Sequence, residues 1–283
     1  MAEELVQIRD AQPTDKEFVL KFTEKTWEWG DYIKYVWDHW LSDPNGKLLV
    51  ADLNGKPIGI LHVQVLPDKC AWFEGLRVHP DYRRRGIALK LNENALEFTR
   101  QRNLKCVRVI IVEWNKPSIR LAEKLGFKIV GYWRSFWVKY RDILKYEHAH
   151  TESKCDLDHI WFLMKKSSML NLSSFYFPLS WRWFKISEKL LRELIKSGDL
   201  HCFLKRNNFI LYEYNKEELT VCFTNFANAT SFLKAIRYLC QKHELKEDAE
   251  IEIILPKSSE LEKDLSKIIR DQETLLLFEK SIN

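Results

Sequence analysis

The sequence contains no run of 18 consecutive apolar residues, although 46% of its 283 residues are hydrophobic. A membrane-spanning helix needs about 20 such residues, so no segment is expected to cross a bilayer. No apolar stretch follows a basic start at the N-terminus, so no signal peptide is expected either. Together these absences predict a cytoplasmic protein.

The sequence also has no Cys-x-x-Cys pair among its six cysteines, which stand at positions 70, 106, 155, 202, 222 and 240. Such scattered cysteines predict reduced thiols that pack as small apolar groups. His148, His150, Cys155 and His159 lie in or near a polar segment over residues 145–155, but their spacing matches no common zinc site. A solvated linker and no metal are therefore expected.

Charge is unevenly divided along the chain. Residues 1–150 contain 25 Lys and Arg against 20 Asp and Glu, a net +5, and the remaining residues contain 20 of each, a net zero. The positive electrostatic field of the first half would favour the binding of a polyphosphate ligand. An excess of this size does not predict nucleic-acid binding.

A basic glycine-containing turn follows the strand predicted over residues 70–78. The strand ends at His79-Pro80, because proline has no N–H to continue a ladder. Arg83-Arg84-Arg85-Gly86 comes next and precedes an amphipathic helix that reaches Arg102. Unpaired N–H groups at residues 84–88 would bind an anion, and Gly86 has no Cβ to obstruct a phosphate. Alone, the motif is equally compatible with a basic loop that caps a surface helix.

The first half predicts an α/β fold with one mixed sheet. The expected order is strand, two helices, three antiparallel strands, helix, strand, helix and two strands. The second helix is capped by Asp31, and Asn54-Gly55 forms the first hairpin turn. The last two strands are expected at residues 127–132 and 135–140. Helices are expected to cover both faces of this sheet.

Four segments of the first 140 residues resemble one family. Arg83-Arg84-Arg85-Gly86-Ile87-Ala88 is similar to the (Gln/Arg)-x-x-Gly-x-(Gly/Ala) signature of the GNAT superfamily of N-acetyltransferases. The preceding residues 78–83, the Asn-containing segment 115–121 and Leu125-Gly126-Phe127 resemble other parts of the same domain. The resemblance implies a GNAT-like fold, acetyl-CoA as co-substrate and acetyl transfer to an amine.

The second half repeats the core order of the first: three strands, helix, strand, helix, strand. The expected segments are strands at 201–205, 209–214 and 219–223, a helix at 229–242, a strand at 251–255, a helix to about 270 and a strand at 274–278. Residues 224–228, Thr-Asn-Phe-Ala-Asn, stand where the first half has its arginine loop. We therefore predict a GNAT-like acetyltransferase domain over 1–148 and a degenerate GNAT-like domain without a phosphate loop over 149–283.

The resemblance also implies roles for residues. Pyrophosphate binding would fall to Arg83, Arg84, Arg85, Gly86, Ile87 and Ala88. The backbone of Leu76, Arg77 and Val78 would pair with the pantetheine arm, and Asn115 and Ser118 would contact its amides. Gly75 suits a bulge that opens the slot, and an N–H near Leu76 would stabilise the oxyanion.

Glu74 stands where many family members carry the glutamate that deprotonates the amine. Its largely apolar strand is expected to raise its pKa, which suits a general base. The alternative is a glutamate that faces solvent at a sheet edge. The family often has a tyrosine acid where this sequence has Ala122. The group that protonates the leaving thiolate is therefore open between Ser118, another residue and water.

The acceptor is less well defined. Segments 30–33, 40–44 and 74–78 are similar to the vertebrate histidine N-acetyltransferase group, which implies a free amino acid or another small amine. Asp31 and Tyr32, with Trp29, Trp133 and Trp137, would line its pocket, and Arg77 or Arg134 would pair with a carboxylate. Alternatives are a protein or peptide acetyltransferase and a non-catalytic acyl-CoA sensor. A monomer or homodimer without nucleic-acid or membrane partners is expected.

Overall fold

The computed structural model describes residues 6–27, 30–147, 154–215 and 217–282. Contacts divide the chain into two compact units that interleave along the sequence. The first unit comprises Met1–Val109, Arg120–Lys128 and Glu279–Asn283, and the second comprises Ile110–Ile119 and Ile129–Phe278. The domain boundary after residue 148 stays a proposal.

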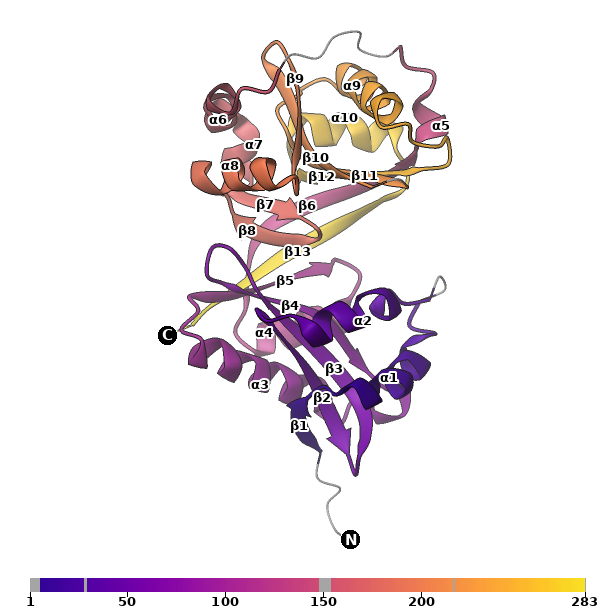
Figure 1. The fold of residues 1–283 in the computed structure, drawn as a ribbon, viewed down its shortest axis with the longest axis vertical. Helices are drawn as coiled ribbons and strands as arrows, with labels where there is room; N and C mark the ends of the chain where they lie inside the picture. Colours follow the sequence, from indigo (N-terminus) through magenta and orange to yellow (C-terminus); the bar gives the residue numbers. More distant parts are fainter. Residues whose placement is uncertain (1–5, 28–29, 148–153, 216, 283) are drawn as a thin grey trace. The chain divides into compact units, whose positions relative to one another are not determined.

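The first unit is built on a mixed sheet with the strand order β1-β2-β3-β4-β5, in which β5 alone runs parallel to its neighbour β4. Residues 7–124, of which 110–119 belong to the second unit, form β1 (Gln7–Asp10), η1 (Pro13–Asp15), α1 (Lys16–Thr23), α2 (Ile33–Ser42), β2 (Gly46–Leu53), β3 (Lys56–Val65), β4 (Ala71–Val78), η2 (Pro80–Tyr82), α3 (Ile87–Gln101), β5 (Cys106–Val112) and α4 (Lys116–Lys124) (Figure 1).

Successive side chains of a strand point to opposite faces of the sheet, and helices cover both faces here. Leu48, Val50 and Ile60 form one buried cluster with side chains of α1 and α2. Gly59 precedes Ile60 and therefore points to the opposite face of the sheet. There it lies against α3, because an added Cβ would be 3.2 Å from atoms of both Ile87 and Leu91. The predicted mixed α/β sheet with flanking helices is confirmed.

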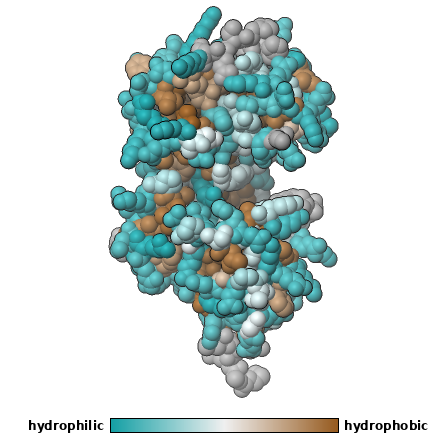
Figure 2. Space-filling model, viewed as in Figure 1, coloured by the Kyte–Doolittle hydropathy of each residue, from teal (hydrophilic) through white to brown (hydrophobic). Residues whose placement is uncertain are grey.

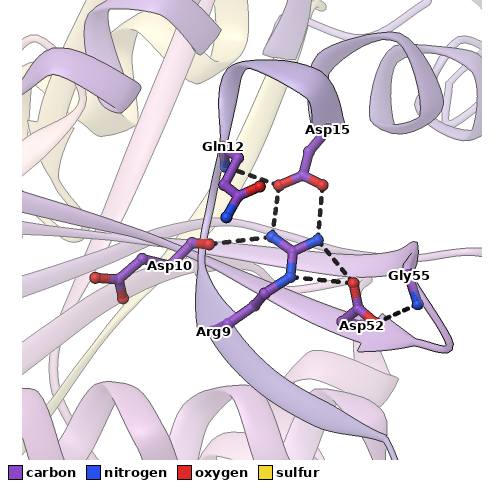
Figure 3. A network of polar contacts seen from close by, with 6 residues as sticks. All are labelled: Arg9, Asp10, Gln12, Asp15, Asp52 and Gly55. Atoms are coloured by element: carbon purple, nitrogen blue, oxygen red, sulfur yellow. Dashed lines mark hydrogen bonds and ion pairs between the residues drawn. The ribbon is translucent and has the colours of Figure 1, made fainter.

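A polar network fixes the N-terminal strand of this unit (Figure 3). The Arg9 guanidinium donates to both carboxylate oxygens of Asp15, at 2.7 and 2.8 Å, and to Asp52 Oδ2 at 2.7 Å. Burial alone would raise the pKa of Asp15, but the hydrogen bonds from Arg9 and the Gln12 N–H lower it. The network therefore ties β1 to η1 and to the β2–β3 hairpin.

The strands of the second unit follow the order β13-β6-β12-β11-β10-β9, in which β11 and β12 are parallel. Its elements are β6 (Lys128–Lys139), α5 (Tyr140–Ile143), α6 (Leu157–Lys166), α7 (Ser168–Leu172), β7 (Tyr176–Leu179), β8 (Arg182–Lys185), α8 (Glu188–Ser197), β9 (His201–Lys205), β10 (Asn208–Tyr214), β11 (Glu218–Thr224), α9 (Ala229–Lys242), β12 (Glu250–Pro256), α10 (Glu260–Ile268) and β13 (Gln272–Ser281). The order from β9 to β13 repeats that from β2 to β6, which confirms the element order predicted for the second half.

Two predictions about the chain are wrong. Residues 127–132 and 135–140 are not two strands, because β6 runs unbroken from Lys128 to Lys139 and pairs with β12 from Trp133 to Lys139. No Gly, Pro or Asn interrupts residues 132–139, so nothing in the chain ends the ladder there.

The cysteines are not all reduced thiols, since Cys70 pairs with Cys106 and Cys155 pairs with Cys202. Cys70 and Cys106 directly precede the paired residues Ala71 and Val107 of β4 and β5, which brings their Cα atoms to 4.7 Å. Cys222 and Cys240 are free and buried. His148 and His150 lie outside the described residues.

The visible surface is mostly hydrophilic, with apolar residues interspersed (Figure 2). This matches a chain in which 30% of residues are charged. None of the helices in the described part of the chain has the length and apolar character that a bilayer crossing requires.

Candidate active site

A fork between β4 and β5 opens the sheet of the first unit. Over the described residues, β4 pairs with β5 only at Ala71 and Trp72. Further along, Arg77 and Val78 pair with β3 alone, opposite Ile60 and Gly59. On the side of the fork residues 76–78 thus have no strand partner in the described part of the chain, although Leu76 O and Val78 O accept hydrogen bonds from the side chains of Arg77 and Arg83. An extended ligand would add there like a strand.

A bulge lies next to the fork, as the sequence predicted. The β3–β4 register shifts between Ile60, opposite Arg77, and His62, opposite Glu74, so that two residues of β4 face one of β3. Gly75 lies in this shift with φ +68°, a conformation that glycine adopts without strain. An added Cβ there would lie 2.5 Å from the Trp40 ring, so the bulge presses the backbone against α2.

Replacing Gly75 by alanine is expected to destabilise the protein. The left-handed backbone costs about 1–3 kcal/mol for a residue with a Cβ, and the overlap with Trp40 costs a similar amount. Gly55→Ala is the matched control, because Gly55 has φ +81° but no atom within 4 Å of an added Cβ. Denaturant unfolding should show a clearly larger loss for Gly75→Ala, and equal losses would contradict the packing argument.

The arginine loop has the geometry of an anion site. Gly86 is the N-cap of α3 with φ +76°, and no side chain accepts a hydrogen bond from the first turn. The first backbone N–H paired within the helix is that of Lys90, which donates to Gly86 O. The N–H groups of residues 86–89 are therefore left for a ligand. An added Cβ on Gly86 would have no atom within 4 Å, so the approach is open.

The three arginines of this loop differ in conformation. Arg83 Nε donates to Val78 O at 3.2 Å, which fastens the loop to the end of β4. Arg84 has φ +62°, and the guanidinium of Arg85 lies 5.2 Å from the centre of the Tyr82 ring. All three are exposed, and none has a carboxylate partner among the described residues. Ile87 is buried beneath the loop, and Ala88 is partly buried.

Glu74 contacts a buried histidine. His62 Nδ1 lies 2.9 Å from Glu74 Oε1, and the histidine side chain has no exposed surface. The Glu74 side chain is 14% exposed, so it is not a fully solvated residue at a sheet edge. Its imidazole partner stacks on Trp40, with ring centres 4.5 Å apart.

Asp31 and Arg77 pair with each other. Arg77 Nε donates to Asp31 Oδ2 at 2.7 Å, and Asp31 Oδ1 accepts the N–H of Ile33 at the start of α2. Tyr32 lies beside them, with its ring 5.4 Å from the Arg77 guanidinium. Burial raises the pKa of Tyr32 to about 12. The negative charges of Glu74 and Asp31 also raise this pKa, whereas Arg77 lowers it. At neutral pH this phenol therefore keeps its proton.

Three of the other proposed acceptor residues, Trp133, Arg134 and Trp137, belong to the second unit. Trp133 is 1% exposed and packs edge-on against Trp183 in the core. Trp137 stacks on Trp181 and lines a cavity of about 420 Å³. Arg134 donates to Glu262 at 3.2 Å. Trp29 lies outside the described residues. Tyr32 and Asp31 are thus the proposed acceptor residues that the first unit itself brings to Glu74.

Asn115 and Ser118 form the start of α4. Asn115 Oδ1 accepts the N–H of Ser118 at 3.3 Å, which occupies the side-chain oxygen in a local cap. Ala122, further along the same helix, is 5% exposed and packs as a core residue. Their contact with a pantetheine arm stays a prediction.

The corresponding loop of the second unit is filled by its own side chains. Asn228, the N-cap of α9, accepts the N–H of Ser231 at 2.9 Å, and Thr224 Oγ1 accepts the N–H of Phe226 at 3.2 Å. The N-cap side chain of α9 thus occupies an N–H of its first turn, whereas Gly86 offers no such side chain at α3. This is the arrangement expected if residues 224–228 do not bind a phosphate, which stays a prediction.

Sequence reasoning missed His62 and Asp43. Asp43 Oδ2 lies 4.0 Å from His62 Nε2, and its side chain is 7% exposed. The available signal was a histidine in the otherwise apolar strand Ile58–Val63, whose alternation places it on the face of Ile60. Trp40 and Asp43 reach His62 only through the packing of α2 and the following loop against the sheet. The alternation of side chains along a strand does not reveal such tertiary packing.

A forked mixed sheet with a bulge and a glycine-capped anion site defines the acetyltransferase class of folds. Residues 7–127, less than half of the chain, match the model of the acetyltransferase (GNAT) family. The chain is 27% identical over 141 residues to an uncharacterized N-acetyltransferase of Methanocaldococcus jannaschii. The match covers 43% of this chain and 60% of that protein.

Solved structures are similar over nearly the whole chain. A GCN5-related N-acetyltransferase from Sphaerobacter thermophilus has a TM-score of 0.68 at 12% identity, with 98% of this chain and 95% of that chain covered. A tandem GNAT protein from the clavulanic acid biosynthesis pathway has a TM-score of 0.61 at 12% identity, with 98% of each chain covered. At these identities the likeness concerns the fold, and it supports two successive GNAT-like folds.

Proposed function

We propose that the protein is an acetyl-CoA-dependent N-acetyltransferase with its catalytic site in the first unit. The observation that carries the proposal is the combination of an open anion site at Gly86, a free strand edge at residues 76–78 and a carboxylate at Glu74. Residues 83–88 bind the pyrophosphate, and residues 76–78 hold the pantetheine arm. Acetyl-CoA supplies the acyl group.

Glu74 acts as the general base. It takes a proton from the acceptor ammonium, directly or through water, so that the amine nitrogen attacks the thioester carbonyl carbon. A C–N bond forms and the C–S bond breaks. An N–H near Leu76 stabilises the oxyanion. The buried Ala122 offers no acid, and Tyr32, which keeps its proton at neutral pH, is a donor near the site.

The acceptor that we propose is a small primary amine. Asp31 pairs with Arg77, so that Glu74 adds a negative charge at the site, which favours a cationic ammonium group. Both arginines expected to bind a carboxylate already have acidic partners, Asp31 for Arg77 and Glu262 for Arg134. The hypothesis that the acceptor is a free amino acid is therefore weaker than the hypothesis of an amine without a carboxylate. The resemblance to the histidine N-acetyltransferase group is weakened for the same reason.

A matched panel tests the acceptor class. Each amino acid is compared with the amine that its decarboxylation gives, and with short peptides, at fixed acetyl-CoA. We expect the amines to have higher kcat/KM than their amino acids. Preference for the amino acids would restore the carboxylate-binding hypothesis, and turnover of peptides alone would make the protein a peptide acetyltransferase.

A non-catalytic acyl-CoA sensor is the second candidate, favoured by alanine at the usual acid position. It predicts acetyl-CoA binding without thiol release on any amine. A coenzyme A thiol leaves without a strong acid, since thiol pKa values are modest, so we favour the enzyme. A cytoplasmic location and a monomeric or homodimeric state remain part of this proposal.

A further inference from the structure

We propose that His62 is the positioning residue for Glu74, and that Asp43 holds the far side of its ring. This inference rests on the proposed function, in which Glu74 is the general base. It concerns residues of the first unit alone. His62 does not contact the substrate in this proposal and acts only through the carboxylate.

The geometry places His62 directly behind the base. The two residues face each other across the β3–β4 ladder at the edge of the bulge, with Nδ1 2.9 Å from Glu74 Oε1. The imidazole is fully buried and lies nearly parallel to Trp40, at an interplanar angle of 9°. A ring held on one face by an indole and at its edge by a carboxylate has little freedom to turn.

The hydrogen-bond inventory decides the tautomer. A glutamate that serves as base is ionised and only accepts, so His62 Nδ1 carries the hydrogen. Nε2 lies 4.0 Å from Asp43 Oδ2, and both atoms are buried without a hydrogen-bond partner among the described residues. His62 Nε2 thus faces a carboxylate oxygen of Asp43 at a distance too long for a hydrogen bond.

Asp43 is itself fixed by the turn that leads into β2. Its Oδ1 accepts the N–H of Asn45 at 2.8 Å. Gly46 allows the arrangement, because an added Cβ would lie 2.4 Å from Asp43 Oδ2 and 2.7 Å from His62 Nε2. Three separate elements, α2, the turn and β3, therefore converge on one imidazole whose remaining nitrogen faces Glu74.

A positioned carboxylate matters because proton abstraction depends on its orientation. A displacement of about 1 Å in a catalytic group is enough to cost about 10²-fold in rate. Glu74 stands beside a glycine bulge, where the backbone offers the least restraint. The hydrogen bond from His62 supplies that restraint from within the sheet.

His62→Leu and His62→Asn form the test pair. Both side chains have the same branched shape, but asparagine places an N–H donor where Nδ1 lies, and leucine has none. We expect His62→Leu to lower kcat by about 10²-fold, with unchanged KM for the amine and unchanged acetyl-CoA affinity. We expect His62→Asn to recover most of the lost rate. Equal losses in the two variants would overturn the proposal.

A double-mutant cycle separates positioning from packing. If His62 acts only through Glu74, the variant with both Glu74→Gln and His62→Leu should be no slower than Glu74→Gln alone. Additive losses would overturn the positioning role. A slow Glu74→Gln with a fast His62→Leu rejects this inference and leaves the proposed function intact, whereas an unchanged rate in Glu74→Gln rejects both.

The wild-type protein provides a measurement that needs no variant of the core. Nitrogen-15 NMR of the histidine rings reports which nitrogen carries hydrogen. We expect a pyrrole-type resonance for His62 Nδ1, assigned by its change in chemical shift when Glu74→Gln replaces the carboxylate acceptor by an amide oxygen. A ring protonated on Nε2 alone would contradict the inferred donor even if a His62 variant failed to fold.

Discussion

Replacing Glu74 by glutamine is expected to lower kcat by about 10²- to 10⁴-fold, the usual contribution of a general base. Glutamine has nearly the same shape, and its amide oxygen still accepts from His62 Nδ1, so the bulge should persist. What is lost is the ability to take a proton from the ammonium. Acetyl-CoA affinity should not change, because residues 76–78 and 83–88 are untouched.

The pH dependence distinguishes a lost base from a damaged site. At higher pH more of the acceptor is already a free amine, so the deficit of Glu74→Gln should shrink as pH rises. Glu93→Gln, on the exposed face of α3, is the matched control and should behave as wild type. A deficit that is the same at every pH would argue against the general-base role.

Reversing the charge of the arginine loop should abolish useful acetyl-CoA binding. A hydrogen bond to a charged group contributes about 1.5–3 kcal/mol, so Arg84→Glu with Arg85→Glu should raise the Kd by about 10²- to 10⁴-fold. Both side chains are exposed, so the fold should survive. Calorimetric titration measures the affinity, and circular dichroism checks the fold.

A second pair of arginines gives the control for overall charge. Arg100 and Arg102 stand at the other end of α3 and are also exposed. Arg100→Glu with Arg102→Glu makes the same change in net charge away from Gly86. This variant should bind acetyl-CoA far better than the loop variant. Equal weakening would mean that the long-range field, not the loop, holds the cofactor.

Elements with strong local signals were predictable from the sequence. The helix over residues 229–242 has its predicted bounds, and α8 begins after its Ser187 cap and ends at Gly198 with φ +86°. The Gly75 bulge was predictable from a glycine inside a strand. In each case the cause lies within a few residues of the effect.

Features that depend on distant partners were not predictable. Arg77 was expected to meet a substrate carboxylate, but its partner Asp31 lies 46 residues earlier in the chain. The unbroken strand β6 is held by β12, which follows it by more than 100 residues. The disulfide of Cys70 and Cys106 and the contact of His62 with Asp43 likewise need the packed sheet.

Release of free thiol from acetyl-CoA tests the central claim most directly. The wild-type protein is incubated with acetyl-CoA and a mixture of small primary amines, and both thiol and acetylated amine are measured. We expect equal amounts of the two products, formed only when an amine is present, and nearly none with Glu74→Gln. Tight binding of acetyl-CoA without thiol release on any amine would contradict the account and make the protein a sensor.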